Sequence, residues 1–262
     1  MNEGAPPYKA VLTHGFVVDK NGRKMSKSLG NVIAPQEVIN ALGADILRLW
    51  VAATDYKAEM SLSQEILQRT SDSYRRIRNT ARYLLGNVDG FVMANNEVAY
   101  EDMLTLDQWA VRTVKKLQVD IEQAYDSYQF HHVYQRLHQF CVLEMGGFYL
   151  DVIKDRLYTM PINSLGRRSA QTALQHILEA LVRLITPVLS FTAEEIWEHM
   201  ADRAEDSVLF ATRYTALDAI TTDAEADVVW RTVLEVREQV ARQIESLRAE
   251  GKIGAALDAD VV

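Results

Sequence analysis

Residues 63–87 read SQEILQRTSDSYRRIRNTARYLLGN, and this stretch decides the fold class. Its apolar side chains recur at intervals of three, four and seven residues, which places them on one face of an α-helix. The pattern ends at Gly86-Asn87, a common way for a helix to stop. The stretch therefore predicts a long amphipathic helix, and its apolar face consists of Leu67, Tyr74, Ile77, Ala81, Leu84 and Leu85.

The same helical spacing continues through most of the remaining chain. Gly146-Gly147 lies inside one of these segments and predicts a kink or a close contact. Thr192 and Glu195 have the spacing of a capping box that opens a short helix through Trp197. Several amphipathic helices joined by short links favour an up-and-down bundle over residues 63–250. Its further helices are predicted at about residues 106–128, 130–158, 174–185, 192–197 and 229–247.

The first 62 residues have a different pattern, which predicts a small α/β part. Residues 8–19 are rich in β-branched and aromatic side chains, and Asn21-Gly22 predicts a tight turn, so we expect a short hairpin. Short helices are predicted from Pro35 to Leu42 and from Ala44 to about Thr54. The fold class is therefore mainly α, and the predicted domains are residues 1–62, 63–250 and 251–262, the last being the start of a truncated C-terminal module.

Composition limits the location and the partners of the chain. Of 262 residues, 48% are hydrophobic, and no apolar run approaches the roughly 20 residues of a membrane span. Without a signal peptide, a cytoplasmic location and no membrane partner are expected. The net charge is −8, but residues 1–90 hold 12 Lys+Arg against 9 Asp+Glu, which leaves 16 against 27 in the remainder. A polyanion should therefore meet the N-terminal third or local basic patches.

Residues 22–31, GRKMSKSLGN, form a segment that we call the lysine loop. Gly22 and Gly30 bound it and permit large backbone changes, while Lys24 and Lys27 could close over a triphosphate. Charge-assisted hydrogen bonds from ammonium groups to phosphate are strong. A generic loop of this composition could equally be a solvated basic turn.

The string Lys-Met-Ser-Lys-Ser at 24–28 decides between these interpretations. It matches the second signature of class I aminoacyl-tRNA synthetases without a mismatch. Residues 74–82, YRRIRNTAR, and their flanks resemble isoleucyl-tRNA synthetases of bacterial type more than the valyl or leucyl relatives. The resemblance covers essentially all 262 residues and includes residues 12–16, 43–52, 55–56, 148–156 and 189–197.

The resemblance implies an isoleucine–tRNA ligase, which forms an aminoacyl-adenylate from ATP and isoleucine and then transfers the aminoacyl group to tRNA(Ile). It makes Lys24 and Lys27 catalytic residues that contact ATP, and it adds Met25, Ser26 and Ser28 to the ATP-binding set. Residues 1–62 would be the C-terminal end of the class I catalytic domain, and residues 63–250 the anticodon-binding bundle. The alternatives are a valyl or leucyl relative, or a helical RNA-binding module without chemistry.

The resemblance also implies what this chain lacks. The sequence contains no His-x-Gly-His string, the first signature of class I enzymes, and a single cysteine, Cys141, cannot supply the family's zinc sites. We therefore expect a monomeric fragment that is inactive alone, in which ATP with Mg²⁺ belongs to the complete enzyme and no zinc or other metal is bound.

Four arginines in residues 63–87 are the candidate tRNA-binding residues. On a helix, Arg75, Arg78 and Arg82 share one stripe and Arg76 points away. Such a stripe suits phosphate contacts to RNA, although ion pairs within the bundle are an equal alternative from spacing alone. His131, His132 and His138 lack a matching set of ligands and are interpreted as packing or surface residues. Core positions are predicted for Cys141, Trp50, Trp109, Trp197 and Trp230.

Overall fold

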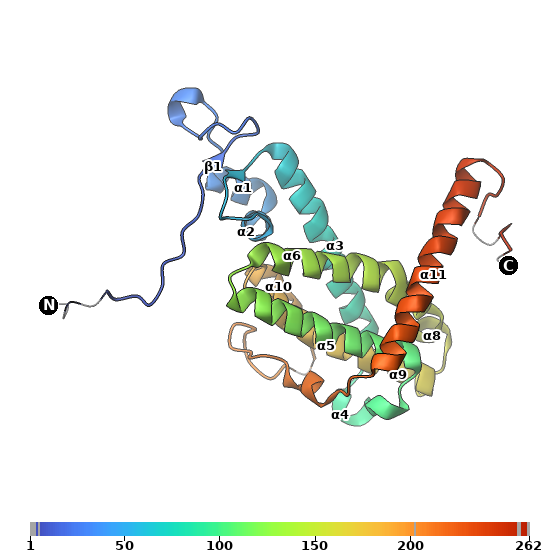
Figure 1. The fold of residues 1–262 in the computed structure, drawn as a ribbon. Helices are drawn as coiled ribbons and strands as arrows, with labels where there is room; N and C mark the ends of the chain where they lie inside the picture. The colour runs from blue at the N-terminus through green and yellow to red at the C-terminus, as the bar shows by residue number, and fades with distance from the viewer. Residues whose placement is uncertain (1–3, 5, 202, 256–257, 261–262) are drawn as a thin grey trace. The chain divides into compact units, whose positions relative to one another are not determined.

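The computed structural model describes residue 4 and residues 6–201, 203–255 and 258–260. Contacts within the chain divide it into two units, Met1–Ala219 and Ile220–Val262. The elements are mostly helices, which confirms the mainly α fold (Figure 1). The predicted boundary between residues 62 and 63 stays a prediction.

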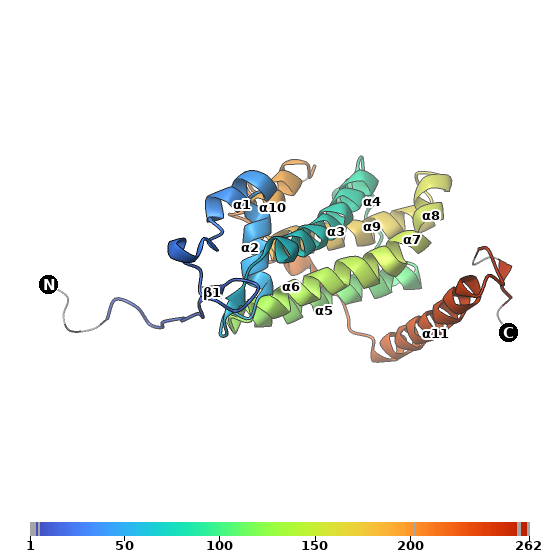
Figure 2. The ribbon, with the colours of Figure 1, turned by 90° about the horizontal axis from the view of Figure 1, so that it is seen from above.

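Four helices build the body of the first unit: α3 (Gln64–Val88), α5 (Thr105–Asp126), α6 (Phe130–Gln139) and α9 (Leu165–Ile185). α9 packs against both α3 and α5, and α6 packs against α5 (Figure 2). α9 is buried over most of its length because its apolar residues cover more than one face. Its fully buried side chains include Ala173, Leu174, Ile177, Leu178, Leu181 and Ile185.

The predicted first helix of the bundle is present as α3. Ser63 caps its start, because its hydroxyl accepts a hydrogen bond from the Ile66 amide at 3.2 Å. The helix then ends at Val88, one residue past the predicted end at Gly86-Asn87. Short turns, α4 (Met93–Asn96) and η2 (Tyr100–Asp102), lead from α3 to α5.

The predicted helix over residues 130–158 is interrupted. α6 runs into a π-helical segment, η3 (Phe140–Tyr149), which is followed by α7 (Leu150–Val152) and α8 (Lys154–Thr159). A Cβ on Gly146 would lie 3.1 Å from the Cys141 carbonyl, and one on Gly147 would lie 3.1 Å from the Val142 carbonyl. The two glycines therefore mark a close contact within the wider π-helical turns.

The capping box predicted at Thr192 is wrong. α10 (Ser190–Glu198) starts two residues earlier, and its N-cap residue, Leu189, makes no side-chain capping bond. The Thr192 hydroxyl instead donates to Asp45, which comes from a distant part of the sequence. After α10, the chain passes through η4 (Thr215–Ala219).

The N-terminal part is less regular than predicted. The predicted strand over residues 8–19 is reduced to β1 (Val17–Val18), which pairs in parallel with β2 (Met60–Ser61); the predicted hairpin is reduced to one antiparallel bridge. Gly15 allows the parallel pairing, because it lets the two backbone segments approach closely. A Cβ at position 15 would lie 1.9 Å from the Ala58 carbonyl oxygen, so any other residue would clash there. The turn at Asn21-Gly22 is present and is closed by an antiparallel bridge between Val18 and Lys24.

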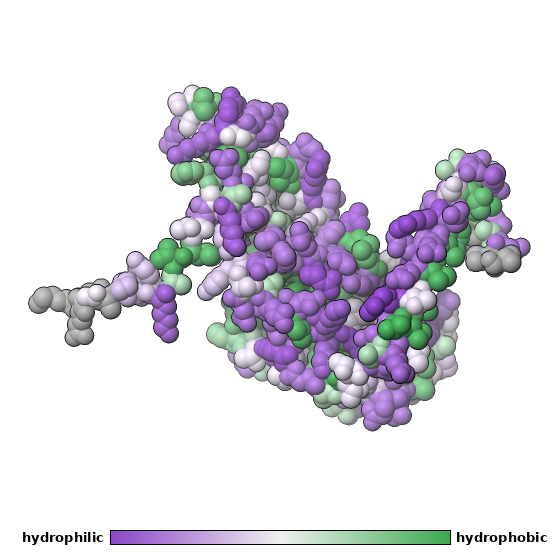
Figure 3. Space-filling view, in the orientation of Figure 1, coloured by the Kyte–Doolittle hydropathy of each residue, from purple (hydrophilic) through white to green (hydrophobic). Residues whose placement is uncertain are grey.

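The two predicted short helices are confirmed as α1 (Pro35–Leu42) and α2 (Ala44–Ala53). Ala34 makes no side-chain cap before α1, as its sequence predicts. The extended segment before β1 exposes large side chains: Tyr8, Val11, Leu12 and Phe16. Green, hydrophobic atoms are seen along the N-terminal segment in Figure 3.

The second unit contains α11 (Ala224–Ala249), whose start is capped by the Asp223 carboxylate through a bond from the Ala226 amide at 2.9 Å. No residue of α11 is buried, so the predicted core position of Trp230 is wrong, whereas Trp50, Trp109 and Trp197 are buried. In the predicted C-terminal module, residues 256–257 and 261–262 lie outside the described residues. Among the helices that are described, none combines the length and the apolar character of a membrane span.

Candidate functional site

The lysine loop is held in a defined conformation after the turn at Asn21-Gly22. Its tip is a single 3₁₀ turn, η1 (Lys27–Leu29), and the Ser26 hydroxyl accepts from the Leu29 amide at 3.3 Å. Gly30 has a φ of 64°, in the left-handed region, and ends the turn. The side chains of Ser26 and Ser28 lie 3.2 Å apart.

Asp19, which is only 8% exposed, anchors this loop through hydrogen bonds to its carboxylate. Its Oδ1 accepts from the amides of Asn21 and Arg23 at 2.9 and 3.0 Å. Its Oδ2 accepts from Arg23 Nη2 at 3.0 Å and from Asn31 Nδ2 at 2.9 Å. The bond from Asn31, followed by those from Arg23, holds the pKa of the Asp19 carboxyl well below its usual range, because each of them favours the charged form.

The two lysines differ in their surroundings. Lys24 Nζ lies 4.5 Å from the centre of the Phe16 ring, a cation–π distance. Lys27 is exposed at the first position of the 3₁₀ turn, and its ammonium group makes no hydrogen bond or ion pair within the part of the chain that is described. Met25 packs against a buried cluster that includes Val38 and Trp50, so it fixes the loop to the body. The five predicted ATP-binding residues are consecutive and lie in this loop, and their contact with ATP stays a prediction.

Helix α2 connects the segment carrying the lysine loop to the bundle. The buried Asp45 carboxylate accepts from the Thr192 amide at 2.7 Å and from the Thr192 hydroxyl at 2.6 Å. Arg48 donates to the carbonyls of Val188 and Pro187 at 2.9 and 2.7 Å, between α9 and α10. The residues that these bonds join are about 140 positions apart in the sequence, so no local sequence pattern predicts them.

The four candidate arginines are all exposed on α3, but the structure does not bring them into one site. Arg75 forms an ion pair with Asp72 on the same helix. Arg78 Nη2 lies 3.2 Å from Glu195 Oε1 on α10. Arg76 faces a different groove, which it lines with Tyr83 and Lys154.

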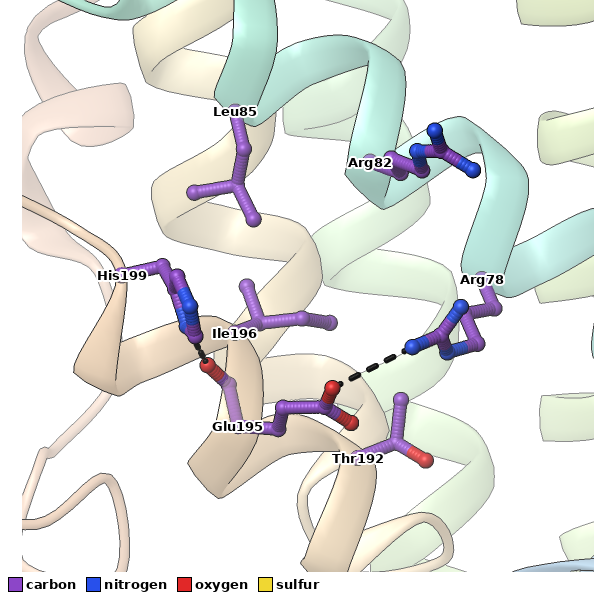
Figure 4. Close-up of a pocket in the computed structure, with 7 residues that line it drawn as sticks. All are labelled: Arg78, Arg82, Leu85, Thr192, Glu195, Ile196 and His199. Carbon is purple, nitrogen blue, oxygen red and sulfur yellow. Dashed lines mark hydrogen bonds and ion pairs between the residues drawn. The ribbon is translucent and has the colours of Figure 1, made fainter.

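Arg78 and Arg82 line a small cavity of about 160 Å³ between α3 and α10 (Figure 4). His199 lies across from them, and its Nδ1 is 2.7 Å from the Glu195 carbonyl oxygen. Among the described residues, neither Arg76 nor Arg82 forms an ion pair, so these two are more available to an anion than Arg75 and Arg78. The remaining lining residues are Leu85, Thr192, Glu195 and Ile196.

Sequence reasoning missed several residues that shape these sites. Asp19, which precedes the lysine loop, and Asn31, its last residue, hold the loop, and only their position at its two ends could have pointed to this role. Glu195 was interpreted as a capping residue and instead contacts Arg78. The described residues contain no group of three His, Cys, Asp or Glu side chains that could hold a metal ion. His131 and His132 lie against each other at 4.4 Å between ring centres.

Comparison with known proteins adds the family. A model described as the anticodon-binding domain of tRNA ligase matches residues 107–262, more than half of the chain. The chain belongs to this tRNA ligase family. A second model, described as tRNA synthetases class I (I, L, M and V), matches residues 1–63 of the tRNA ligase chain, the part that carries the lysine loop.

Curated relatives confirm the resemblance to isoleucyl-tRNA synthetases. The chain is 55% identical over 259 residues to the isoleucine–tRNA ligase of Methylococcus capsulatus, covering 98% of this chain and 28% of that one. It is 57% identical over 259 residues to the isoleucine–tRNA ligase of Thioalkalivibrio sulfidiphilus, covering 98% and 27%. The chain therefore spans little more than a quarter of these relatives, and it resembles them more than it resembles the valyl or leucyl alternatives.

Solved structures share the fold at low identity. One is the LeuRS of Agrobacterium radiobacter K84 in a ternary complex with tRNA and LeuAMS, with a TM-score of 0.56 and 21% identity over 87% of this chain and 29% of that chain. Another is the methionyl-tRNA synthetase of Mycobacterium tuberculosis in complex with methionyl-adenylate, with a TM-score of 0.59 and 19% identity over 79% and 40%. These likenesses show the fold of the tRNA ligase.

Proposed function

We propose that this chain supplies the lysine loop and the tRNA-binding helices of an isoleucine–tRNA ligase. The observation that carries the proposal is the identity of 55–57% to isoleucine–tRNA ligases over 98% of the chain. The loop conformation supports it, because Lys27 is exposed at the tip while Met25 fixes the base of the loop. The complete enzyme would act as a monomer in the cytoplasm.

Lys27 and Lys24 are proposed to contact the triphosphate of ATP. When the isoleucine carboxylate attacks the α-phosphate, negative charge grows on the leaving pyrophosphate, and an ammonium group aimed at that charge stabilises it. Ser26 and Ser28 would support the loop by hydrogen bonds, as Ser26 already does through the Leu29 amide. Mg²⁺ would accompany the ATP, but the described residues offer no set of protein ligands for it, so no step is assigned to the metal.

The tRNA contacts are proposed for Arg75, Arg76, Arg78 and Arg82 on α3. Arg76 and Arg82 form no ion pair among the described residues, whereas Arg75 is paired with Asp72 and Arg78 must exchange Glu195 for a phosphate. Arg82→Ala should therefore weaken tRNA binding more than Arg75→Ala, and it should lower the slope of log affinity against log salt by about one. Equal affinities and slopes for both variants would contradict this order.

The test of the function is amino-acid-dependent ATP–pyrophosphate exchange by the complete enzyme, followed by aminoacylation of tRNA(Ile). We expect isoleucine to support exchange far better than leucine, and better than valine by the roughly 10–200-fold that one methylene allows. Faster exchange with valine or leucine would overturn the assignment. The 262-residue chain alone should show no isoleucine-dependent exchange, because the resemblance places the adenine and isoleucine pockets in the remainder of the enzyme.

A further inference from the structure

Asn31, the last residue of the lysine loop, contacts both sides of that loop. Its Nδ2 donates to Asp19 Oδ2 at 2.9 Å and lies 3.4 Å from the Lys24 carbonyl oxygen. Its Oδ1 accepts from the Ser26 amide at 2.9 Å. The Asn31 side chain thus connects Asp19, which precedes the Asn21-Gly22 turn, to Ser26, the N-cap residue of the 3₁₀ turn.

Asp19 gives this contact a fixed base. Two backbone amides and the Arg23 guanidinium hold its carboxylate, so the oxygen that receives Asn31 cannot easily move. A bond to a charged acceptor is about twice as strong as one between neutral groups. The Asp19–Asn31 pair therefore ties the two ends of the loop together and leaves its tip, residues 27–30, free to meet a ligand.

We propose that Asn31 and Asp19 are positioning residues for adenylate formation that act through Lys27. The inference rests on the proposed function, in which Lys27 contacts the ATP phosphates. Asn31 orients Ser26, and Ser26 closes the 3₁₀ turn whose first residue is Lys27. Without Asn31, the Ser26 amide loses its acceptor and Lys27 samples positions away from the phosphates. A misplaced catalytic group of this kind slows the chemical step.

The pair differs from residues that merely stabilise the fold. Asn31 is half-buried, and all of its hydrogen-bond partners lie within residues 19–31. The bundle core around α9 receives nothing from it. Asn40 is a matched control, because it is an exposed asparagine on α1 whose side-chain bond is to Gln36 at 3.4 Å.

Hydrogen exchange on the 262-residue chain tests the structural half of the proposal. In Asn31→Ala, amide exchange in a peptide covering residues 19–31 should quicken by about tenfold, the effect of losing a bond worth about 1.4 kcal/mol. Peptides from α9 should be unchanged, and Asn40→Ala should match the parent in both regions. Unchanged exchange over residues 19–31 in Asn31→Ala would overturn the proposal.

Kinetics of the complete enzyme test the functional half. Asn31→Ala should lower kcat for isoleucine-dependent exchange about tenfold, with KM for ATP within about twofold, since the lost interaction acts in the transition state. Asp19→Asn should resemble it, because its amide would face the donors of Arg23 and Asn31. The double variant Lys27→Ala/Asn31→Ala should be no slower than Lys27→Ala.

Additive losses in that double variant would overturn the proposal, because Asn31 would then not act through Lys27. A lack of isoleucine-dependent exchange in the unmodified enzyme would instead contradict the proposed function. The hydrogen-exchange result, which needs no activity, still decides whether the pair holds the loop.

Discussion

Replacing Asp45 by Asn should destabilise the first unit by about 2–3 kcal/mol. The carboxylate of Asp45 is 6% exposed and accepts two short bonds from Thr192, at 2.7 Å from the amide and 2.6 Å from the hydroxyl. A hydrogen bond to a charged group contributes about 1.5–3 kcal/mol. Both Thr192 bonds reach Oδ2, while Oδ1 accepts from the Phe191 amide at 3.4 Å. An Asn whose oxygen takes the Oδ2 position keeps both Thr192 bonds, but they then go to a neutral acceptor, and its NH₂ group faces the Phe191 amide, which loses its acceptor.

The Asp45 carboxylate lies at the N-terminus of α10, and this position adds to the loss of stability in Asp45→Asn. A negative charge near a helix N-terminus contributes about 0.3–1 kcal/mol, and Asn removes that charge. Thr192→Val removes the hydroxyl bond but keeps the amide bond, so it should cost about 1–2 kcal/mol. In the double variant the losses should fall short of their sum, because both changes act on the same bond between the Thr192 hydroxyl and Asp45.

The assay is urea unfolding followed by tryptophan fluorescence. Trp230 lies in the second unit, so a Trp230→Phe background leaves Trp50, Trp109 and Trp197 to report on the first unit. Glu59→Gln is the matched control, since Glu59 is exposed and the change is the same carboxylate-to-amide exchange. If Asp45→Asn stays within about 0.5 kcal/mol of the Glu59→Gln control, Asp45 does not connect α2 to α10 energetically.

Two further predictions concern buried groups of the first unit. The fully buried Asp107 carboxylate accepts hydrogen bonds from the Arg156 guanidinium at 2.7 and 2.9 Å and from the Tyr149 hydroxyl at 2.8 Å, so Asp107→Asn should lower the free energy of unfolding in urea by about 3–5 kcal/mol. The double variant Asp107→Asn/Arg156→Met should lose less than the sum of the two single variants, and additive losses would contradict an ion pair. Burial lowers the pKa of His176 to about 4 from 6.5, and Glu97 lies 3.9 Å from it. Because the unfolded chain binds the proton more readily, stability should rise by about 3 kcal/mol from pH 4 to 6.5, and the rise should flatten in His176→Asn but not in the exposed control His199→Asn.

Local patterns predicted the helices of this protein well. Pro35, Gly43 and Ser63 mark helix ends that depend on backbone geometry and capping within a few residues, so the sequence around them suffices. The lysine loop was predicted as a unit for the same reason, since its glycines, serines and lysines are adjacent.

Contacts between distant segments could not be predicted in this way. Thr192 has the spacing of a capping box, but the competing bond to Asp45 arises from packing of α2 against α10. The sequence predicts a hairpin at β1, but only the single bridge from Val18 to Lys24 forms there. The main partner of β1 is residues 60–61, because Gly15 allows the backbone to approach Ala58 closely. The spacing places Arg78 and Arg82 on one stripe of α3, but it does not predict that Glu195 on α10 forms an ion pair with Arg78 and not with Arg82.

In the proposed function, Lys27 stabilises the charge that develops on the phosphates of ATP. The most direct measurement is isoleucine-dependent ATP–pyrophosphate exchange by the complete enzyme carrying Lys27→Ala, with Lys20→Ala as the control for an exposed lysine before the loop. We predict that Lys27→Ala lowers kcat about 100-fold or more while tRNA affinity and the Lys20→Ala control stay near the parent. Equal exchange rates in Lys27→Ala and the parent would contradict the claim.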